Sequence, residues 1–209
     1  PSVIMVAIGS VMNYFLNLIL YSFSKLAVAV FGAYFKVQSM AFMPVFGLNN
    51  GMIPIISYNY GAQKPDRMKR TMKLGVMVGC SIMVFCLAIM QVFPGQILKI
   101  FDATDEMLLM GIPAVRIMST AFIFAGFSVT CSGMFQAVGK GVYSMIVSMA
   151  RQLFVILPVA YFLSKAMNSV NGVWAAFPIA EVFSVIISTI FLLRVYKKIV
   201  KPMESVQRD

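Results

Sequence analysis

The chain has 209 residues, of which 60% are hydrophobic and 11% charged, and its formal net charge is +10. A soluble globular domain carries about 25% charged residues, so this composition excludes an ordinary water-soluble protein and predicts a membrane protein. A basic chain can also indicate nucleic acid binding. We expect no nucleic acid partner here, because the sequence contains no polar basic domain that could carry one.

The apolar residues are gathered in long runs rather than spread along the chain. A helix that crosses the core of a bilayer, about 30 Å thick, needs about 20 apolar residues. Six runs meet this length, at residues 3–23, 28–56, 74–93, 112–135, 142–163 and 173–195. The alternating polarity of a membrane strand is not seen in them. We therefore predict an all-α integral membrane protein, with six transmembrane helices in residues 1–200 and a cytoplasmic tail at 201–209.

The cations lie mainly in the connections on one side of these runs. Loops rich in Lys and Arg are typically cytoplasmic. With both termini inside, the inner segments hold Lys64, Arg67, Lys69, Arg70, Lys73, Lys140, Arg194, Lys197, Lys198, Lys201 and Arg208. The outer segments hold Lys25, Lys99 and Lys165, together with Asp102, Asp105 and Glu106. This asymmetry predicts a multi-pass plasma-membrane protein with both termini in the cytoplasm.

Three charged residues fall deep inside the predicted spans. At a rise of 1.5 Å per residue, Lys36, Arg151 and Glu181 each lie about 12 to 13 Å from an end of their helix. Ionisable residues at such depth commonly face a wet cavity and mark a functional pathway. The alternative is a static ion pair between Glu181 and Arg151 or Lys36 that fixes helix packing. The sequence leaves both interpretations of this charge network open.

Polar side chains also recur at spacings of three and four residues, which places them on single helix faces. Such residues can join helices to one another, but three polar faces among six helices favour a shared cavity. The predicted lining consists of Asn13, Asn17, Tyr21, Lys36, Ser39, Met43, Asn50, Glu181 and Ser184. Two glycine pairs, Gly47 with Gly51 and Gly75 with Gly79, have the spacing of close helix–helix contacts.

Several kinds of chemistry are excluded by what the chain lacks. It contains no histidine, so a Ser-His or Cys-His catalytic pair and a zinc-binding HExxH helix are impossible. Cys80, Cys86 and Cys131 all lie within apolar runs, where thiols act as small packing groups. We predict neither enzymatic activity nor a metal or organic cofactor. Transport and a structural role in the membrane remain.

Four stretches resemble segments of the multidrug and toxic compound extrusion (MATE) transporters. PVFGLNNGMIPIISYNYGAQKPDRMKR (44–70) is similar to the eighth helix of that family and the basic loop after it. GMFQAVGKG (133–141) resembles the stretch that leaves the tenth helix. ARQLFVILPVAYFL (150–163) and NGVWAAFPIAE (171–181) resemble helices eleven and twelve. The resemblance extends over essentially the whole chain.

This resemblance implies one lobe, the C-terminal six helices, of a twelve-helix secondary antiporter that exports small organic, often cationic, compounds. The implied partners are the N-terminal six-helix lobe of the same transporter and membrane lipid, and the implied coupling ion is H⁺ or Na⁺. Some sodium-coupled members carry acids in helices seven and ten. Residues 3–23 and 112–135 contain none, which leaves the coupling carboxylate in the other lobe or at Glu181.

Two further functions stay open at this level. A flippase for lipid-linked sugars from the same wider superfamily would share the architecture. A membrane scaffold that binds no substrate would share the hydrophobicity.

Overall fold

The structure, a computed structural model, describes residues 2–206, without the side chains of residues 2, 3, 6 and 206. All of its regular elements are helices, as predicted. In chain order they are α1 (Ser2–Tyr21), α2 (Lys25–Gly61), α3 (Pro65–Val92), α4 (Pro94–Lys99), α5 (Asp105–Ser119), α6 (Phe122–Ala137), α7 (Gly141–Met149), the π-helix η1 (Ala150–Ile156), α8 (Leu157–Ala166), α9 (Asn171–Val195), the π-helix η2 (Tyr196–Val200) and α10 (Lys201–Val206). Arg208, predicted among the inner cations, lies outside the described residues.

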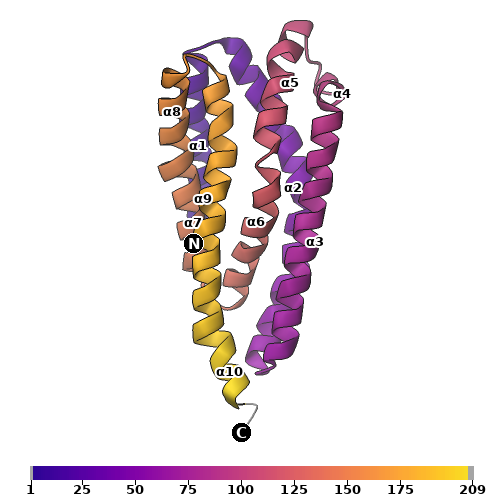
Figure 1. Cartoon of the computed structure of the whole chain (residues 1–209), viewed down its shortest axis with the longest axis vertical. Helices are drawn as coiled ribbons and strands as arrows, with labels where there is room; N and C mark the ends of the chain where they lie inside the picture. Colours follow the sequence, from indigo (N-terminus) through magenta and orange to yellow (C-terminus); the bar gives the residue numbers. More distant parts are fainter. Residues whose placement is uncertain (1, 207–209) are drawn as a thin grey trace.

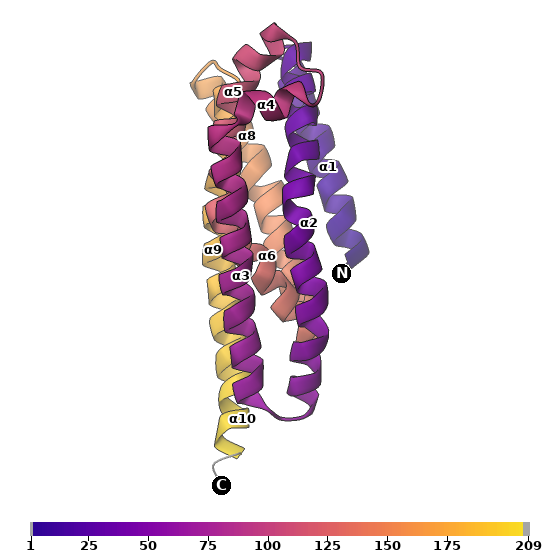
Figure 2. The same cartoon turned by 90° about the vertical axis from the view of Figure 1, so that its right-hand side faces the viewer.

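The long helices run side by side along one axis and form a bundle (Figures 1 and 2). The α1–α2, α4–α5 and α8–α9 connections lie at its upper end, whereas the α2–α3 turn and the C-terminal helix lie at its lower end (Figure 1). Helix α6 is central and contacts α2, α3 and α9. The two ends therefore carry most of the connections that the charge pattern distinguishes, although the α6–α7 connection, which includes Lys140, lies above the lower end (Figure 1).

Length and composition support membrane insertion of most of these helices. In the described part of the chain, four uninterrupted helical stretches are long and apolar enough to span a bilayer, namely α2, α3, Gly141–Ala166 and Asn171–Ser205, and the bent pair α5–α6 can make a fifth. The described apolar part of α1, Ala7–Tyr21, is shorter. The fold class is thus an all-helical, multi-pass membrane protein, while six complete spans remain a prediction.

The helix predicted at 112–135 is not continuous, because the structure has two helices there, bent by 50° at residues 120 and 121. The bent pair can still form one span. The hydroxyl groups of Ser119 and Thr120 donate to the carbonyl oxygens of Arg116 and Ile117. From α3, Gln91 Nε2 donates to the same Arg116 oxygen at 2.8 Å. Side chains that satisfy backbone groups in this way allow a sharp bend inside a membrane.

Three predicted boundaries also change. Helix α2 begins at Lys25, and Ser24 is its N-cap, whose Oγ accepts a hydrogen bond from Ala27 N at 3.0 Å. The helix continues past the predicted end at residue 56 to Gly61. The basic stretch after it is mainly helix rather than loop, because Pro65, which suits a first helical turn, starts α3. The predicted tail begins as helix α10 and continues the line of α9 (Figure 1).

The close contact of α3 with α6 depends on small residues. A Cβ atom built on Gly126 of α6 would lie 2.9 Å from the backbone Cα of Cys80, closer than a real Cβ can approach. Gly75 and Gly79 leave similar room for Met52 and Thr130, as their spacing predicts. The other predicted glycine contact is wrong. Gly47 and Gly51 are exposed, and a Cβ on either meets no described atom within 4 Å.

Buried side chains form two clusters along the bundle. The larger contains Leu20, Tyr34 and Trp174, and Trp174 stacks on Phe31 with 6.4 Å between ring centroids. The second contains Ile56, Met68 and Val200, near the α2–α3 turn. The candidate site described below draws its lining from both clusters.

The glycine contact predicts that Gly126→Ala lowers stability by about 1–3 kcal/mol, since the new methyl group meets backbone that cannot move aside. The measurement is thermal unfolding of the detergent-solubilised protein. Gly51→Ala is the matched control, because it adds the same methyl group at an open helical position and should be neutral or stabilising by about 1 kcal/mol. Equal effects of the two substitutions would contradict the packing account.

Candidate functional site

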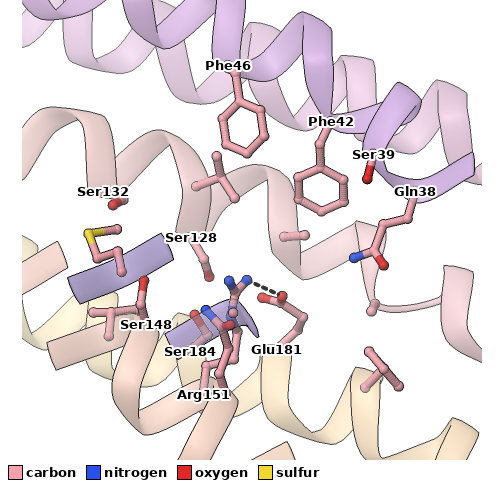
Figure 3. A pocket seen from close by; sticks show the side chains of 18 of the residues that line it. Gln38, Ser39, Phe42, Phe46, Ser128, Ser132, Ser148, Arg151, Glu181 and Ser184 are labelled. Atoms are coloured by element: carbon pink, nitrogen blue, oxygen red, sulfur yellow. Dashed lines mark hydrogen bonds and ion pairs between the residues drawn. The ribbon is translucent and has the colours of Figure 1, made fainter. Parts of the chain in front are cut away.

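A cavity of about 500 Å³ lies within the bundle. Residues of α1, α2, α6, α7, η1 and α9 surround it, and Figure 3 shows the side chains of α2 facing those of α6, η1 and α9 across it. Its polar lining consists of Asn13, Tyr34, Gln38, Ser39, Asn49, Asn50, Ser128, Ser132, Gln136, Ser148, Arg151, Gln152, Glu181 and Ser184. These polar groups interrupt a lining that is mainly apolar, and they come from five helices and η1 rather than from one helix–helix contact.

One ion pair lies in the lining of this cavity. Arg151 Nη1 donates to Glu181 Oε1 at 2.6 Å (Figure 3). Glu181 lies on α9, and Arg151 is the second residue of η1. The structure thus brings together two of the three charges of the predicted network, from segments 30 residues apart.

Arg151 lies in the π-helix η1, which continues directly from α7. The cavity-lining residues of this stretch are Val147, Ser148, Arg151, Gln152 and Ile156. Their spacing of three to five residues keeps them on one side of the helical stretch, and π-turns of this kind are frequent at functional sites. The ion pair with Glu181 shows that this side is directed toward α9.

The ion pair is largely shielded from solvent but its hydrogen-bonding capacity is not filled. The side chains of Arg151 and Glu181 are 22% and 10% exposed. Arg151 Nε and Glu181 Oε2 are buried without a hydrogen-bond partner among the described residues. Such groups are rarely left unsatisfied inside a protein, so both atoms remain available to water or to a ligand that enters the cavity.

Other buried oxygen atoms in the lining also lack a hydrogen-bond partner among the described residues. They are side-chain oxygen atoms of five lining residues, namely Asn13, Gln38, Asn49, Ser128 and Ser184. Asn49 is held in place, since its Nδ2 donates to the Val129 carbonyl oxygen at 3.0 Å and Gly133 leaves room for its amide. Each unsatisfied buried acceptor costs about 1–3 kcal/mol. The cavity is therefore suited to a ligand or water that supplies donors.

Aromatic rings form much of the apolar part of the wall. Phe35, Phe42 and Phe46 come from α2, Phe122 from α6 and Phe177 from α9. Phe42 and Phe122 meet edge to face with 5.4 Å between centroids. Rings beside a few convergent polar atoms are typical of small-molecule sites, because the rings pack against the body of a ligand and the polar atoms orient it.

The predicted lining is reproduced only in part. Asn13, Ser39, Asn50, Glu181 and Ser184 border the cavity, whereas Asn17, Tyr21, Lys36 and Met43 lie away from it. On α2 the lining residues include Gln38, Phe42 and Asn49. Each of these residues is the chain neighbour of a predicted one. The centre of the cavity-facing side of α2 is therefore rotated around the helix axis by about 100° from the predicted face. The three phenylalanine rings of α2 that are part of the wall, Phe35, Phe42 and Phe46, are invisible to a search for polar residues.

Lys36 does not join the charge network. It is exposed and borders a separate hollow with Asp102, Ala29 and Gly32, where α2 passes the connection between α4 and α5. The physical reason is helical geometry, because Lys36 lies about 200° around α2 from Gln38. Of the two predicted partners for Glu181, the structure has Arg151.

Several cavity residues were missed from sequence. On α6, Ser128, Ser132 and Gln136 line the cavity at intervals of four residues, so their common face was readable. Gln38 and Asn49 are single polar residues among apolar ones, and Ser148 and Gln152 flank Arg151. Their position depends on the helix register and on η1, which residue spacing does not reveal.

Metal binding finds no support in the described part of the chain. No group of three or more His, Cys, Asp or Glu side chains gathers there. The three cysteines are free. A monovalent cation or a proton at Glu181 needs no such group, and it is considered below.

The family model named MatE matches residues 1–162, which is most of the chain. The chain belongs to the MatE family. Its members are transporters and not enzymes. The multidrug export protein MepA of Staphylococcus haemolyticus is 26% identical over 175 residues, covering 84% of this chain and 38% of that protein. This MatE chain therefore spans well under half the length of that relative.

Solved structures share the fold. An outward-facing conformation of a multidrug resistance MATE family transporter of the MOP superfamily aligns with a TM-score of 0.86 and 19% identity, over 96% of this chain and 45% of that one. An inward-facing conformation of such a transporter aligns with a TM-score of 0.87 and 19% identity, over 97% of this chain and 46% of that one. The fold of this MatE chain is thus that of about half of each transporter.

If water fills the cavity, side chains in its lining should react with water-soluble reagents, whereas side chains packed away from the lining should not. In a background without native cysteines, Ser39→Cys should react with a water-soluble thiol reagent, because Ser39 borders the cavity and is exposed. Ser188→Cys is the matched control, since Ser188 is fully buried on α9 away from the lining. We expect at least a tenfold difference in labelling rate, read by mass spectrometry. Equal labelling would contradict a water-filled cavity.

Proposed function

We propose that this chain forms the C-terminal six-helix lobe of a cation-coupled antiporter that exports drugs or other small organic compounds. The observation that carries the proposal is the cavity. Its aromatic wall, unsatisfied oxygen atoms and buried carboxylate suit an organic molecule that bears donor groups or positive charge. Family membership and the name of the Staphylococcus relative, a multidrug export protein, support the same function.

The proposed partner is the N-terminal six-helix lobe of the same transporter. The match to less than half of each solved chain supports this division. A single lobe supplies one wall of a central site, and a second lobe would supply the other. The chain resembles an outward-facing and an inward-facing structure equally well, which supports a lobe that moves as a unit.

The proposed location is the plasma membrane, with both termini in the cytoplasm. The positive-inside tendency supports this orientation, since the α2–α3 turn and the C-terminal helix share the lower end of the bundle (Figure 1). Lys64, Arg67, Arg70 and Lys201 are exposed there. The acidic Asp105 and Glu106 belong to the α4–α5 end.

Glu181 is the proposed coupling or substrate-binding carboxylate of this lobe. It is the one acid among the described residues of the cavity lining, and its Oε2 atom is unpaired there. A proton or a sodium ion at this oxygen would compete with Arg151 for the carboxylate. Competition between an ion and an internal partner is a simple way to link ion binding to a change in structure.

Glu181→Gln tests the proposal in the full-length protein. We expect a near-normal folded yield and strongly reduced efflux, because the cavity can hydrate Arg151 after its partner is removed. The second substitution, Arg151→Gln, should not restore efflux. Efflux from drug-sensitive cells and the yield of monodisperse protein are the two measurements.

If the ion pair between Arg151 and Glu181 only stabilises the fold, the opposite results for yield and efflux are expected. In that case Glu181→Gln would lower stability by about 3–5 kcal/mol, and the double substitution would restore both folding and efflux. Glu106→Gln is the control, because it removes one exposed carboxylate at the end of the bundle. Normal efflux together with normal yield in Glu181→Gln would refute a role for this residue in either form.

A further inference from the structure

The lower end of the bundle holds a concentration of positive charge that takes no part in the cavity. Two segments carry it, the first turns of α3 and the stretch from the end of α9 to α10. Their exposed cations are Arg67, Arg70, Lys73, Arg194, Lys197, Lys198 and Lys201. None of these borders the cavity, so the transport site does not explain them. Orientation in the membrane requires positive charge on this side but no particular arrangement of it.

An ion pair joins the two segments. Lys69 Nζ of α3 lies 2.6 Å from Glu204 Oε1 of α10, across 135 residues of sequence, and 2.9 Å from Asp66 Oδ1. Beneath it, Met68 and Val200 are fully buried in one cluster. Figures 1 and 2 both show α10 beside the start of α3. The ion pair and the shared buried cluster therefore hold the two basic segments together.

The cations above this ion pair have no acid to neutralise them. Helix α3 runs away from the lower end and α10 runs toward it (Figure 2). One turn up from Lys69 on α3 is Lys73, and one turn up from Glu204 on α10 is Lys201. Lys197 follows one turn beyond Lys201. Among the described residues, these three lysines form no ion pair, and all three are exposed.

Exposed apolar side chains continue the same faces into the bundle. On α3, Met77 follows Lys73 by four residues and is 55% exposed. On α9, Leu193 and Ile190 precede Lys197 at intervals of four and three residues and are 55% and 46% exposed. Each face therefore presents cations at the end of the bundle and apolar surface directly above them. A phospholipid has the same arrangement, with an anionic phosphate followed by acyl chains.

We propose that Lys73, Lys197 and Lys201 bind the phosphate of an anionic phospholipid, and that the Lys69–Glu204 ion pair holds α3 and α10 in the spacing this requires. The acyl chains then lie along Met77 and Leu193. Cations next to a membrane contribute about fivefold in affinity each for anionic lipid. Neutral phospholipid lacks the net charge and binds weakly.

The test uses the full-length transporter in detergent and native mass spectrometry. The probes are phosphatidylglycerol, phosphatidylcholine and inorganic phosphate. Replacing Lys73, Lys197 and Lys201 together by Gln should reduce the apparent affinity for phosphatidylglycerol on the order of 100-fold. The matched control replaces Lys25, Lys99 and Lys165, three exposed lysines in the connections of the opposite end, and should leave the affinity within about twofold.

A second variant separates a defined site from diffuse attraction. Glu204→Gln makes the protein more positive, so diffuse attraction would strengthen phosphatidylglycerol binding. The proposal predicts the reverse, a severalfold loss, because α10 is released from α3. Stronger binding in Glu204→Gln, equal binding of phosphatidylcholine, equal loss in the two triple variants, or competition by millimolar inorganic phosphate would each overturn the proposal. If the triple variant does not fold, the Glu204→Gln result decides alone.

Discussion

The ion pair between Arg151 and Glu181 is the constraint around which the centre of the molecule is arranged. Two opposite charges inside a membrane are tolerated only when each has a close partner, and here the charged atoms are 2.6 Å apart. That distance requires α9 and η1 to face each other with Arg151 in a defined register. Since one salt bridge leaves Arg151 Nε and Glu181 Oε2 unsatisfied, apolar side chains cannot seal the surroundings without cost. A cavity with polar groups around the ion pair is the consequence.

The remainder of the bundle keeps that cavity open while keeping the helices together. Gly126 allows α3 to approach α6 at backbone distance, so α3 supports the helix that carries Ser128 and Ser132 of the cavity lining. The bend between α5 and α6 is stabilised by Gln91 from α3. At the lower end, the Lys69–Glu204 ion pair ties α10, the continuation of α9, to α3. Helix α9, which carries Glu181, is therefore restrained at both the cavity and the end of the bundle.

Much of this was readable from the sequence, and the exceptions have physical causes. Hydrophobic runs predicted the helices, because these follow from composition. The depth of Arg151 and Glu181 within their helices predicted that the two charges could pair, and the structure has this ion pair. Lys36 was misplaced since depth says nothing about direction around the helix. The bend at residues 120 and 121 involves hydroxyl groups and a glutamine from another helix, which is a tertiary effect. The π-helix that carries Arg151 likewise has no residue signature.

The central claim is that the cavity beside Arg151 and Glu181 is where a transported compound binds. The most direct measurement is an experimental structure of the full-length transporter with a bound organic cation such as tetraphenylphosphonium. The account predicts that the ligand lies within this cavity, with its rings against Phe42 and Phe122 and its positive centre nearer to Glu181 than to Arg151. A ligand bound outside the cavity, with the cavity itself unchanged, would contradict the account.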